Sequence, residues 1–512
     1  MSPRLSAKPD SSFFRKIAIG AVGARAVRVD LQHCGHAVFE LENGSTDTRI
    51  WKNVKRKRVR IPDLVCAHCG LRVESRAKTK PELAMSHSPT DAERAWDFGM
   101  VDSDVIAFPI CRSIAETAWS RGELEQNQSY WHSQDRIRWK TRTYINYIRV
   151  GAFRQVLHSR SSTKGVVEGS ETSIVWDAVF STREGTVEAV RDGKISVRRA
   201  SDAHLYTWQN RKQLPVVVGE GDVVQEVQIL AAPVDPLGQD ELQCPRSMGS
   251  SRLPEMLSSP ERTQRFTGIK LARLREEPVY AQVVDRITHH PDEDIYVRLE
   301  GTVYLTRVCG RSARRLIGPY LESMDEQTRL EAVVALAESG TAESVEMLSG
   351  VLDRQDAPLF LRSAAAWALG RIGTERAAER LIQAFADVSS AVREEALEAI
   401  GSVGEPALGQ LLAALMGDEQ AIAAGSAEAI RRQNLLPQEA VDDVVKAIQG
   451  DPGQHWAVWL LGSLSREKEY FRSAIAELQD SRPEAHYAVT VLWSFMESWI
   501  ARHWELRPGA EA

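Results

Sequence analysis

The most specific chemistry in this chain lies on two carboxylates and two cations, Asp63, Glu74, Arg76 and Lys78. Asp63 ends one apolar, strand-like run, and the other three residues alternate along the next run. Side chains that alternate on a strand share one face, so a tight hairpin would bring the two carboxylates together beside the cations. Carboxylate oxygens suit a divalent cation, which in turn polarises a phosphoryl group. The pattern predicts a site that holds a divalent metal against a phosphodiester.

A Cys-x-x-Cys-Gly sequence between these two runs predicts a structural zinc site. Cys66 and Cys69 have the spacing of a zinc knuckle, in which two thiolates lie at a tight turn and the following glycine lets backbone N–H groups approach the sulfurs. Tetrahedral zinc needs two further ligands. We expect Cys34 and His36 to supply them, because their Cys-Gly-His turn precedes the first strand and resembles a second knuckle.

The other cysteines and histidines leave alternatives open. His87 and Cys111 could replace the first pair as zinc ligands. A buried thiol is the competing interpretation of Cys111, and also of Cys244 and Cys309. Six cysteines are too few and too scattered for a disulfide framework in a chain of 512 residues.

The run Ile61–Lys78 resembles the signature of the PD-(D/E)xK nuclease superfamily, in which Pro-Asp ends one strand and an acidic-x-Lys follows on the neighbouring strand. The resemblance implies that Asp63 and Glu74 bind a catalytic Mg²⁺ and that a lysine positions or activates the attacking water. Arg76 occupies the strict lysine position, and arginine is practically never deprotonated. Lys78, two residues farther on, would have to take that role, and otherwise the site is inactive. Salt bridges on a zinc-held hairpin are the alternative interpretation.

Charge is distributed unevenly along the chain. Residues 1–160 carry 27 Lys and Arg against 17 Asp and Glu, a net charge of +10, which leaves −16 for the remainder. The dense run of cations next to the candidate site predicts contact with nucleic-acid phosphates, those of DNA above all. A solvated strand or loop is the alternative. The densest run consists of Arg49, Lys52, Lys55, Arg56, Lys57, Arg58 and Arg60.

We expect a multidomain protein. Residues 1–160 form a zinc-containing, nuclease-like α/β domain, and residues 165–235, with short β-rich runs and Gly-containing turns such as Asp192-Gly193, form a small all-β, barrel-like domain. This second region resembles the sandwich-barrel hybrid motif of large RNA polymerase subunits. Residues 236–265 read as a linker and residues 266–320 as a mixed, β-leaning connecting region.

Residues 321–505 are expected to form a C-terminal α-solenoid. Residues 329–341, 362–374 and 393–405 superimpose at offsets of 33 and 31. They resemble the short HEAT repeats, which implies helix pairs that cannot bury their apolar faces alone and must stack. Such solenoids bind protein partners and carry no chemistry by default.

These observations predict a metal-dependent DNA phosphodiester hydrolase, endonuclease-like, with a helical-repeat scaffold, serving in defence against foreign DNA or in repair. The alternative is a non-catalytic zinc-containing adaptor that grips nucleic acid and recruits a protein through its repeats. No Walker loop or nucleophile elbow is present. No run of about 18 apolar residues and no secretory signal is seen, so we expect a cytoplasmic protein without a membrane span.

Overall fold

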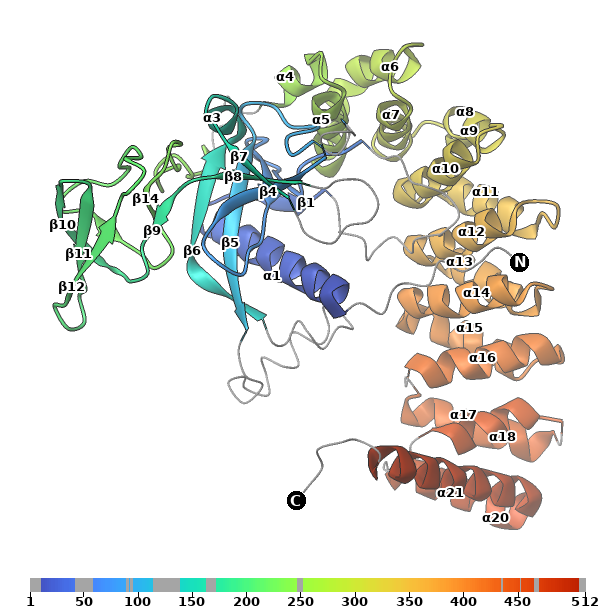
Figure 1. Ribbon diagram of the computed structural model, residues 1–512. Coiled ribbons are helices and arrows are strands. Elements are labelled where there is room, and N and C mark those ends of the chain that lie inside the picture. The colour runs from blue at the N-terminus through green and yellow to red at the C-terminus, as the bar shows by residue number, and fades with distance from the viewer. Residues whose placement is uncertain are drawn as a thin grey trace. The chain divides into compact units, whose positions relative to one another are not determined.

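The structure is a computed structural model that divides into two compact units, residues 1–283 and 284–512 (Figure 1). Each unit is described by itself. Among the described residues, no helix has the length and apolar character needed to cross a membrane. The residues that the structure describes are 11–41, 59–88, 92, 95–113, 139–162, 172–245, 252–433, 436–451, 453–464 and 469–505.

A five-stranded sheet of order β1-β2-β3-β5-β6 forms the core of the first unit. The first three strands make an antiparallel meander, β3 and β5 run parallel, and β5 and β6 are antiparallel. A long helix, α1 (Ser11–His33), packs against β5 and β6. The hairpin of β2 and β3 was predicted from the sequence. The strands are Val38–Glu40, Leu64–Cys66, Arg72–Ser75, Val105–Ser113 and Trp139–Arg149.

The sheet is buried on both faces because β5 alternates its side chains between two apolar clusters. Val105 and Ala107 pack with Val27 of α1, while Ile106 and Phe108 pack on the other face. Gly23 permits this packing, since a Cβ there would lie 2.5 Å from the Ala77 Cβ.

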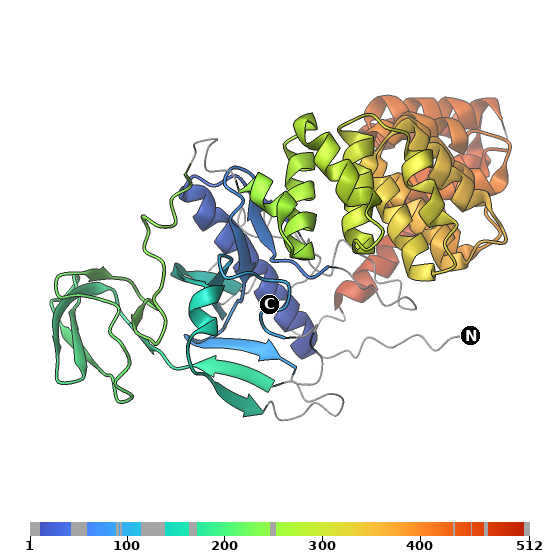
Figure 2. The ribbon, with the colours of Figure 1, turned by 90° about the horizontal axis from the view of Figure 1, so that it is seen from above.

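A three-stranded sheet of order β4-β8-β7 and the short helix α3 contribute to the cluster on the second face (Figure 2). Trp176 on β8 stands at its centre, in edge contact with Trp96 and in tilted contact with Phe153. The elements are β4 (Leu83–His87), α3 (Val150–Arg154), β7 (Ser159–Ser162) and β8 (Thr172–Trp176).

The small β-rich region was expected to be barrel-like, but the described residues form no closed barrel. They form a four-stranded sheet of order β12-β11-β10-β13 and a separate pair, β14-β9. The Asp192-Gly193 turn was placed correctly: both residues have positive φ, 51° and 68°, as a two-residue hairpin between β10 and β11 requires. The strands are Val179–Phe180, Gly185–Arg191, Lys194–Arg198, Leu205–Gln209, Val223–Val224 and Ile229–Ala231.

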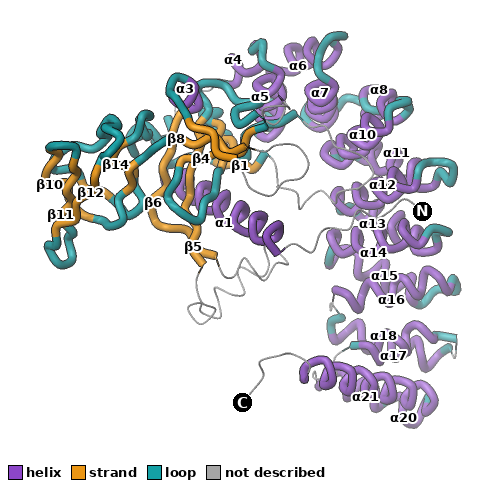
Figure 3. The backbone as a smooth tube through the Cα atoms, in the orientation of Figure 1, coloured by secondary structure: helices purple, strands orange, loops and turns teal. Residues whose placement is uncertain are grey.

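The expected linker and β-leaning region were wrong. Within residues 236–265, Leu237 and Leu242 belong to the core beneath α1. All the regular secondary structure within residues 266–320 is helical. Figure 3 shows that no strand follows β14 in the described residues. The β-branched residues that suggested strands, such as Val297 and Val303, are instead buried in the helix Ile295–Arg307. The helices are α4 (Leu253–Ser258), α5 (Arg262–Leu274), η6 (Pro278–Tyr280), α6 (Ala281–His289), α7 (Ile295–Arg307), α8 (Ala313–Leu316) and α9 (Gly318–Leu321).

The second unit continues as stacked helix pairs (Figure 1). Its remaining helices are α10 (Glu326–Ser339), α11 (Ala342–Asp353), α12 (Leu359–Ile372), α13 (Glu375–Gln383), η7 (Ala384–Ala386), α14 (Ser390–Val403), η8 (Glu405–Ala407), α15 (Leu408–Leu415), α16 (Gln420–Gln433), α17 (Gln438–Gly450), α18 (His455–Ser463), α19 (Glu469–Ala476), α20 (Leu478–Ser481) and α21 (Pro483–Glu505).

The repeated Gly-Thr dipeptides explain how the helices end and begin again. Gly340 and Gly373 adopt the left-handed conformation after α10 and α12, which glycine tolerates without a Cβ clash. The next residues, Thr341 and Thr374, accept hydrogen bonds from backbone N–H groups of the following helix. A tight turn of this kind therefore joins α10 to α11 and α12 to α13.

In two of the helices, α7 and α12, an arginine at the same place in the repeat binds the end of the preceding helix. Arg298 donates to the carbonyl of Thr288, and Arg362 donates to that of Leu352. Arg298-Leu-Glu lies 31 residues before Arg329-Leu-Glu, so the repeat begins in sequence earlier than residue 321. That signal was present in the sequence and was missed.

Candidate metal centre

Four side chains of the first unit converge on one point. The ligand atoms of His36, Cys66, Cys69 and Cys244 all lie within 4.8 Å of one another. Three of the residues are buried and Cys244 is nearly so. Among the described residues, this is the one group of three or more His, Cys, Asp or Glu side chains with such spacing.

Tight turns position the first three ligands. His36 follows Gly35, whose φ of 82° turns the chain at the end of α1. Cys66 ends β2 and Cys69 lies in the turn to β3, where the Gly70 N–H donates to the Cys66 carbonyl at 2.9 Å. The φ of 78° at Gly70 explains why glycine follows the knuckle.

Cys244 reaches the knuckle from a distant part of the chain. Its backbone N–H donates to the Cys34 carbonyl at 2.9 Å. Two residues earlier, the Leu242 carbonyl lies 2.7 Å from the His36 Nε2. The segment that was expected to be a linker is thus held against the end of α1.

The spacing of the ligand atoms fits a tetrahedral metal. The Sγ atoms of Cys66 and Cys244 are 3.8 Å apart, and Cys69 Sγ is 3.6 Å from His36 Nδ1. Zinc bonds of about 2.3 Å to sulfur and about 2.0–2.1 Å to nitrogen give tetrahedral edges of about 3.8 Å for S–S and about 3.6 Å for S–N. The Cys₃His group could therefore bind a metal such as zinc, and four protein ligands would leave no open position for catalysis.

The surroundings favour the ligand forms of these side chains. A His36 Nε2–H that donates to the Leu242 carbonyl leaves the Nδ1 lone pair toward Cys69. The side-chain hydrogen bond with Cys69 lowers the pKa of Cys66 to about 3, and the His68 N–H donates to the same sulfur at 3.3 Å. The same bond and burial raise the pKa of Cys69. A lowered pKa favours the thiolate, which is the form of cysteine that binds a metal.

Helix α5 supports the knuckle from outside. Arg275 donates to the carbonyl of Ala67 and, at 2.6 Å, to that of His68. A Cβ at Gly70 would lie 3.2 Å from Met256 of α4. Arg275 and α4 therefore both contact the knuckle.

The observed group differs from the expected one at a single position. Cys34 is not among the four residues, and Cys244 takes its place. The alternative ligands are also elsewhere: His87 lies on β4, and Cys111 is buried with Ile19 and Trp139, where burial raises its pKa to about 12. Sequence reasoning missed Cys244 because it lies 175 residues beyond Cys69 in a Pro- and Ser-containing segment.

The expected carboxylate pair lies on neighbouring strands. Leu64 pairs with Val73, so continuing this register by one residue brings Asp63 beside Glu74. However, Asp63 Oδ2 accepts the Ser75 N–H at 2.8 Å, and this bond fixes the hairpin. Each carboxylate has a structural partner, since Glu74 pairs with Arg76 at 2.8 Å.

Access to this pair is limited. Only 9% of the Glu74 side chain is exposed. Lys78 extends β3 along β5 through its backbone and lies 3.9 Å from Glu82, and burial lowers the pKa of its amine. Neither Asp63 nor Glu74 joins the metal-ligand group found among the described residues.

Most of the basic run lies outside the described residues. This applies to Lys52, Lys55, Arg56, Lys57 and Arg58. Arg60 is described, and it donates to the Ala95 carbonyl at 2.9 Å. DNA binding by this run therefore stays a prediction.

Comparisons with known proteins identify the class of the helical unit. Residues 355–431 match the family model of HEAT repeats. A search of curated proteins found no match. The C-terminal helical region thus carries HEAT repeats, as the sequence predicted. The family comparison does not support the predicted nuclease family.

Several solved structures resemble part of the chain. One is a chain of the complex of CpcE and CpcF of phycocyanin lyase from Nostoc sp. PCC7120, with 15% identity, a TM-score of 0.22, and coverage of 44% of this chain and 92% of that one. Human deoxyhypusine hydroxylase has 16% identity, a TM-score of 0.22, and coverage of 45% and 99%. An engineered protein has 19% identity, a TM-score of 0.25, and coverage of 47% and 71%.

Proposed function

We propose that this protein is a non-catalytic adaptor, in which a zinc-held first unit accompanies a HEAT-repeat unit that binds another protein. The single observation that carries the proposal is the stack of helix pairs from α7 to α21, of which residues 355–431 match HEAT repeats. Each pair contacts its neighbours in the stack, and such repeats offer extended surfaces for partners.

Charge favours a protein partner over DNA for the HEAT-repeat unit. Residues 284–512 carry 22 Lys and Arg against 36 Asp and Glu, a net charge of −14, whereas residues 1–283 carry 42 against 34. A surface of this sign repels nucleic-acid phosphate and attracts basic segments. Any contact with DNA would then fall to the first unit.

In the first unit, the proposed zinc has a structural role. Bound by His36, Cys66, Cys69 and Cys244, it would join the end of α1, the β2–β3 turn and the segment before α4. A metal that four protein ligands saturate stabilises a fold and does not activate water.

Cross-linking of the full chain in lysate, followed by mass spectrometry, tests the adaptor. We expect reproducible partner cross-links on residues 284–505. A reversed-charge variant of one exposed carboxylate that cross-links to the partner should weaken its capture. Partners confined to residues 1–283, or no reproducible partner, would contradict the proposal.

Phosphodiester hydrolysis is the second candidate, and the register that brings Asp63 beside Glu74 is the observation that favours it. Lys78, whose amine has a lowered pKa because of burial, would supply the base. The pairing of Glu74 with Arg76 and its small exposure favour a structural role instead.

A plasmid assay separates the two candidates. The full chain is incubated with plasmid and Mg²⁺ beside Glu74→Gln, which removes the charge with little change of shape, and an EDTA control. We expect no cleavage by any sample. Cleavage by the wild type that both controls abolish would establish the hydrolytic function.

A further inference from the structure

Two cavities adjoin each other in the last repeats of the HEAT-repeat unit. The smaller has a volume of about 150 Å³ and the larger about 350 Å³. Asp451, Gln454 and His455, in the turn between α17 and α18, line both. We call the two cavities together the loop-edge groove.

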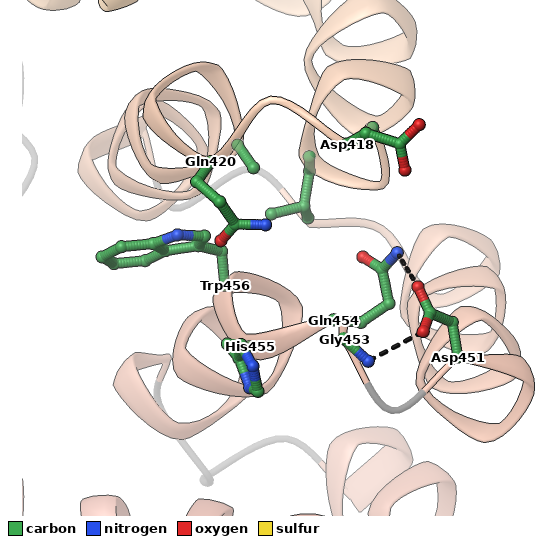
Figure 4. Close-up of a pocket in the computed structure, with 10 residues that line it drawn as sticks. Asp418, Gln420, Asp451, Gly453, Gln454, His455 and Trp456 are labelled. Carbon is green, nitrogen blue, oxygen red and sulfur yellow. Dashed lines mark hydrogen bonds between the residues drawn. The ribbon is translucent and has the colours of Figure 1, made fainter.

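The smaller cavity is mainly polar, with a tryptophan at one end (Figure 4). Gln420 and Gln454 come from consecutive helix pairs, and the ring of Trp456 lies on the side away from Asp418 and Asp451. Asp451 accepts hydrogen bonds from the Gly453 N–H at 2.8 Å and from Gln454 Nε2 at 3.1 Å. These bonds hold the carboxylate in place, and the first of them lowers the pKa of Asp451, so the group is charged at neutral pH.

The larger cavity is mainly apolar. Val458 and Trp459 of α18 line it together with Ala488 and Leu492 of α21. Two of its charged residues, Arg482 and Glu484, pair with each other at 2.7 Å, and Asp451 lines it as well.

Counted together, the charges of the groove are negative. Asp418, Asp451 and Glu484 line the groove together with Arg482 and the exposed His455. Glu484 pairs with Arg482, which leaves the two carboxylates of Asp418 and Asp451 as the remaining negative charges of the groove. The overall charge of −14 of the unit has the same sign.

We propose that the loop-edge groove binds an extended segment of a partner protein in which an arginine is followed two residues later by an apolar side chain. The inference rests on the proposed adaptor function and names its partner chemistry. In an extended chain, residues two apart point to the same side and lie about 6.6 Å apart. The two adjoining cavities, which share three lining residues, suit such a pair.

Each side chain of the segment has a matching surface. The guanidinium enters the smaller cavity, which Asp418 and Asp451 line with the opposite charge. The apolar side chain enters the larger cavity against Val458 and Leu492. The amide of Gln420 lines the same cavity, where it can bond to the peptide backbone.

Fluorescence polarisation with the full chain tests the proposal. The probe is a fluorescein-labelled Gly-Ser-Arg-Ala-Leu-Ser-Gly peptide, and the control peptides replace Arg by Glu or Leu by Ser. We expect the probe to bind at least about tenfold more tightly than either control, a difference of about 1.4 kcal/mol, and to lose affinity as salt is raised. Equal binding of the three peptides, or no binding, would overturn the proposal.

Variants locate the binding to the groove. Asp418→Asn and Asp451→Asn together should lower the affinity for the probe at least about tenfold. Ala488→Glu should fill the larger cavity and abolish the preference for Leu over Ser. Glu419→Gln removes a neighbouring exposed charge that does not line either cavity, and it should leave binding unchanged. Retained helix content by circular dichroism shows that a variant is folded.

The groove assignment and the adaptor proposal can fail independently of each other. If the cross-linked partner is captured equally by wild type and by the double Asn variant, the adaptor stands and the groove assignment is wrong. If no partner is found, the adaptor proposal is contradicted whatever the peptide measurements show.

Discussion

Arg72 and Asp104 form a bidentate ion pair in which both side chains are 0% exposed. Arg72 Nε donates to Asp104 Oδ1 at 2.9 Å, and a second nitrogen donates to Oδ2. The same guanidinium donates to the Thr263 carbonyl and the Thr267 hydroxyl of α5. One buried cation therefore joins β3, the turn before β5 and the helix that supports the metal centre.

Removal of one partner of this pair should destabilise the first unit strongly. Asp104→Asn leaves Arg72 buried without its counter-charge, and we expect a loss of about 3–5 kcal/mol. Double replacement by Arg72→Met and Asp104→Leu should cost less than the single change. Denaturant unfolding of the full chain, with hydrogen exchange to assign the transition, measures both effects. Glu188→Gln breaks an exposed pair with Arg198 and should change stability little, so an equal effect there would refute the argument.

Cys244 should be required for metal binding and Cys34 should not. Cys244→Ser removes one of four convergent ligands. Loss of a residue that only hydrogen-bonds to a metal ligand lowers metal affinity by about 10–100-fold. We expect the loss of zinc affinity to be larger here, because a ligand itself is removed. Zinc content by mass spectrometry and competition with a chelating dye measure the change. Cys34→Ser is the matched control. Full zinc retention by the Cys244 variant would show that the ion binds elsewhere.

Tyr147 should make the first unit sensitive to alkali. Its hydroxyl donates to Asp30 Oδ2 at 2.7 Å, and burial, with the Asp30 charge, raises the pKa of the phenol. The unfolded chain ionises near pH 10 and the folded chain does not, so stability should fall by about 1.4 kcal/mol for each pH unit above about 10. Tyr147→Phe should cost about 1 kcal/mol at pH 7.

The difference in stability between the wild type and Tyr147→Phe should then shrink above pH 10, because the variant lacks the phenol that titrates. Unfolding midpoints across pH 7–11 measure it. Parallel pH profiles for the wild type and the variant would contradict the assignment.

Gly370 should be intolerant of a larger side chain. A Cβ at this position of α12 would lie 2.6 Å from the Ala399 carbonyl of α14. We expect Gly370→Ala to cost about 1–3 kcal/mol, since backbone atoms must move apart. Gly401→Ala, on a helix with open space at the Cβ position, should be neutral or stabilising by up to about 1 kcal/mol. Thermal unfolding of both variants compares them directly.

Local sequence determined the features that depend on neighbouring residues. The Gly-Thr dipeptides fixed the turns between α10 and α11 and between α12 and α13, because a left-handed residue and a capping hydroxyl act within a few positions. The Asp192-Gly193 hairpin and the knuckle at Cys66 and Cys69 follow from the same short-range physics.

Only the tertiary structure decided which distant residues meet. Cys244 completes the ligand group and Asp104 neutralises Arg72, although neither carries a local signal of its partner. The β-branched stretch of α7 is helical because the stack buries the helix on all sides, with every residue from 299 to 306 buried. The sequence also supplied the carboxylates of a hydrolytic site, but the fold buries Glu74 against Arg76, and burial of a side chain is a property of the whole packed unit.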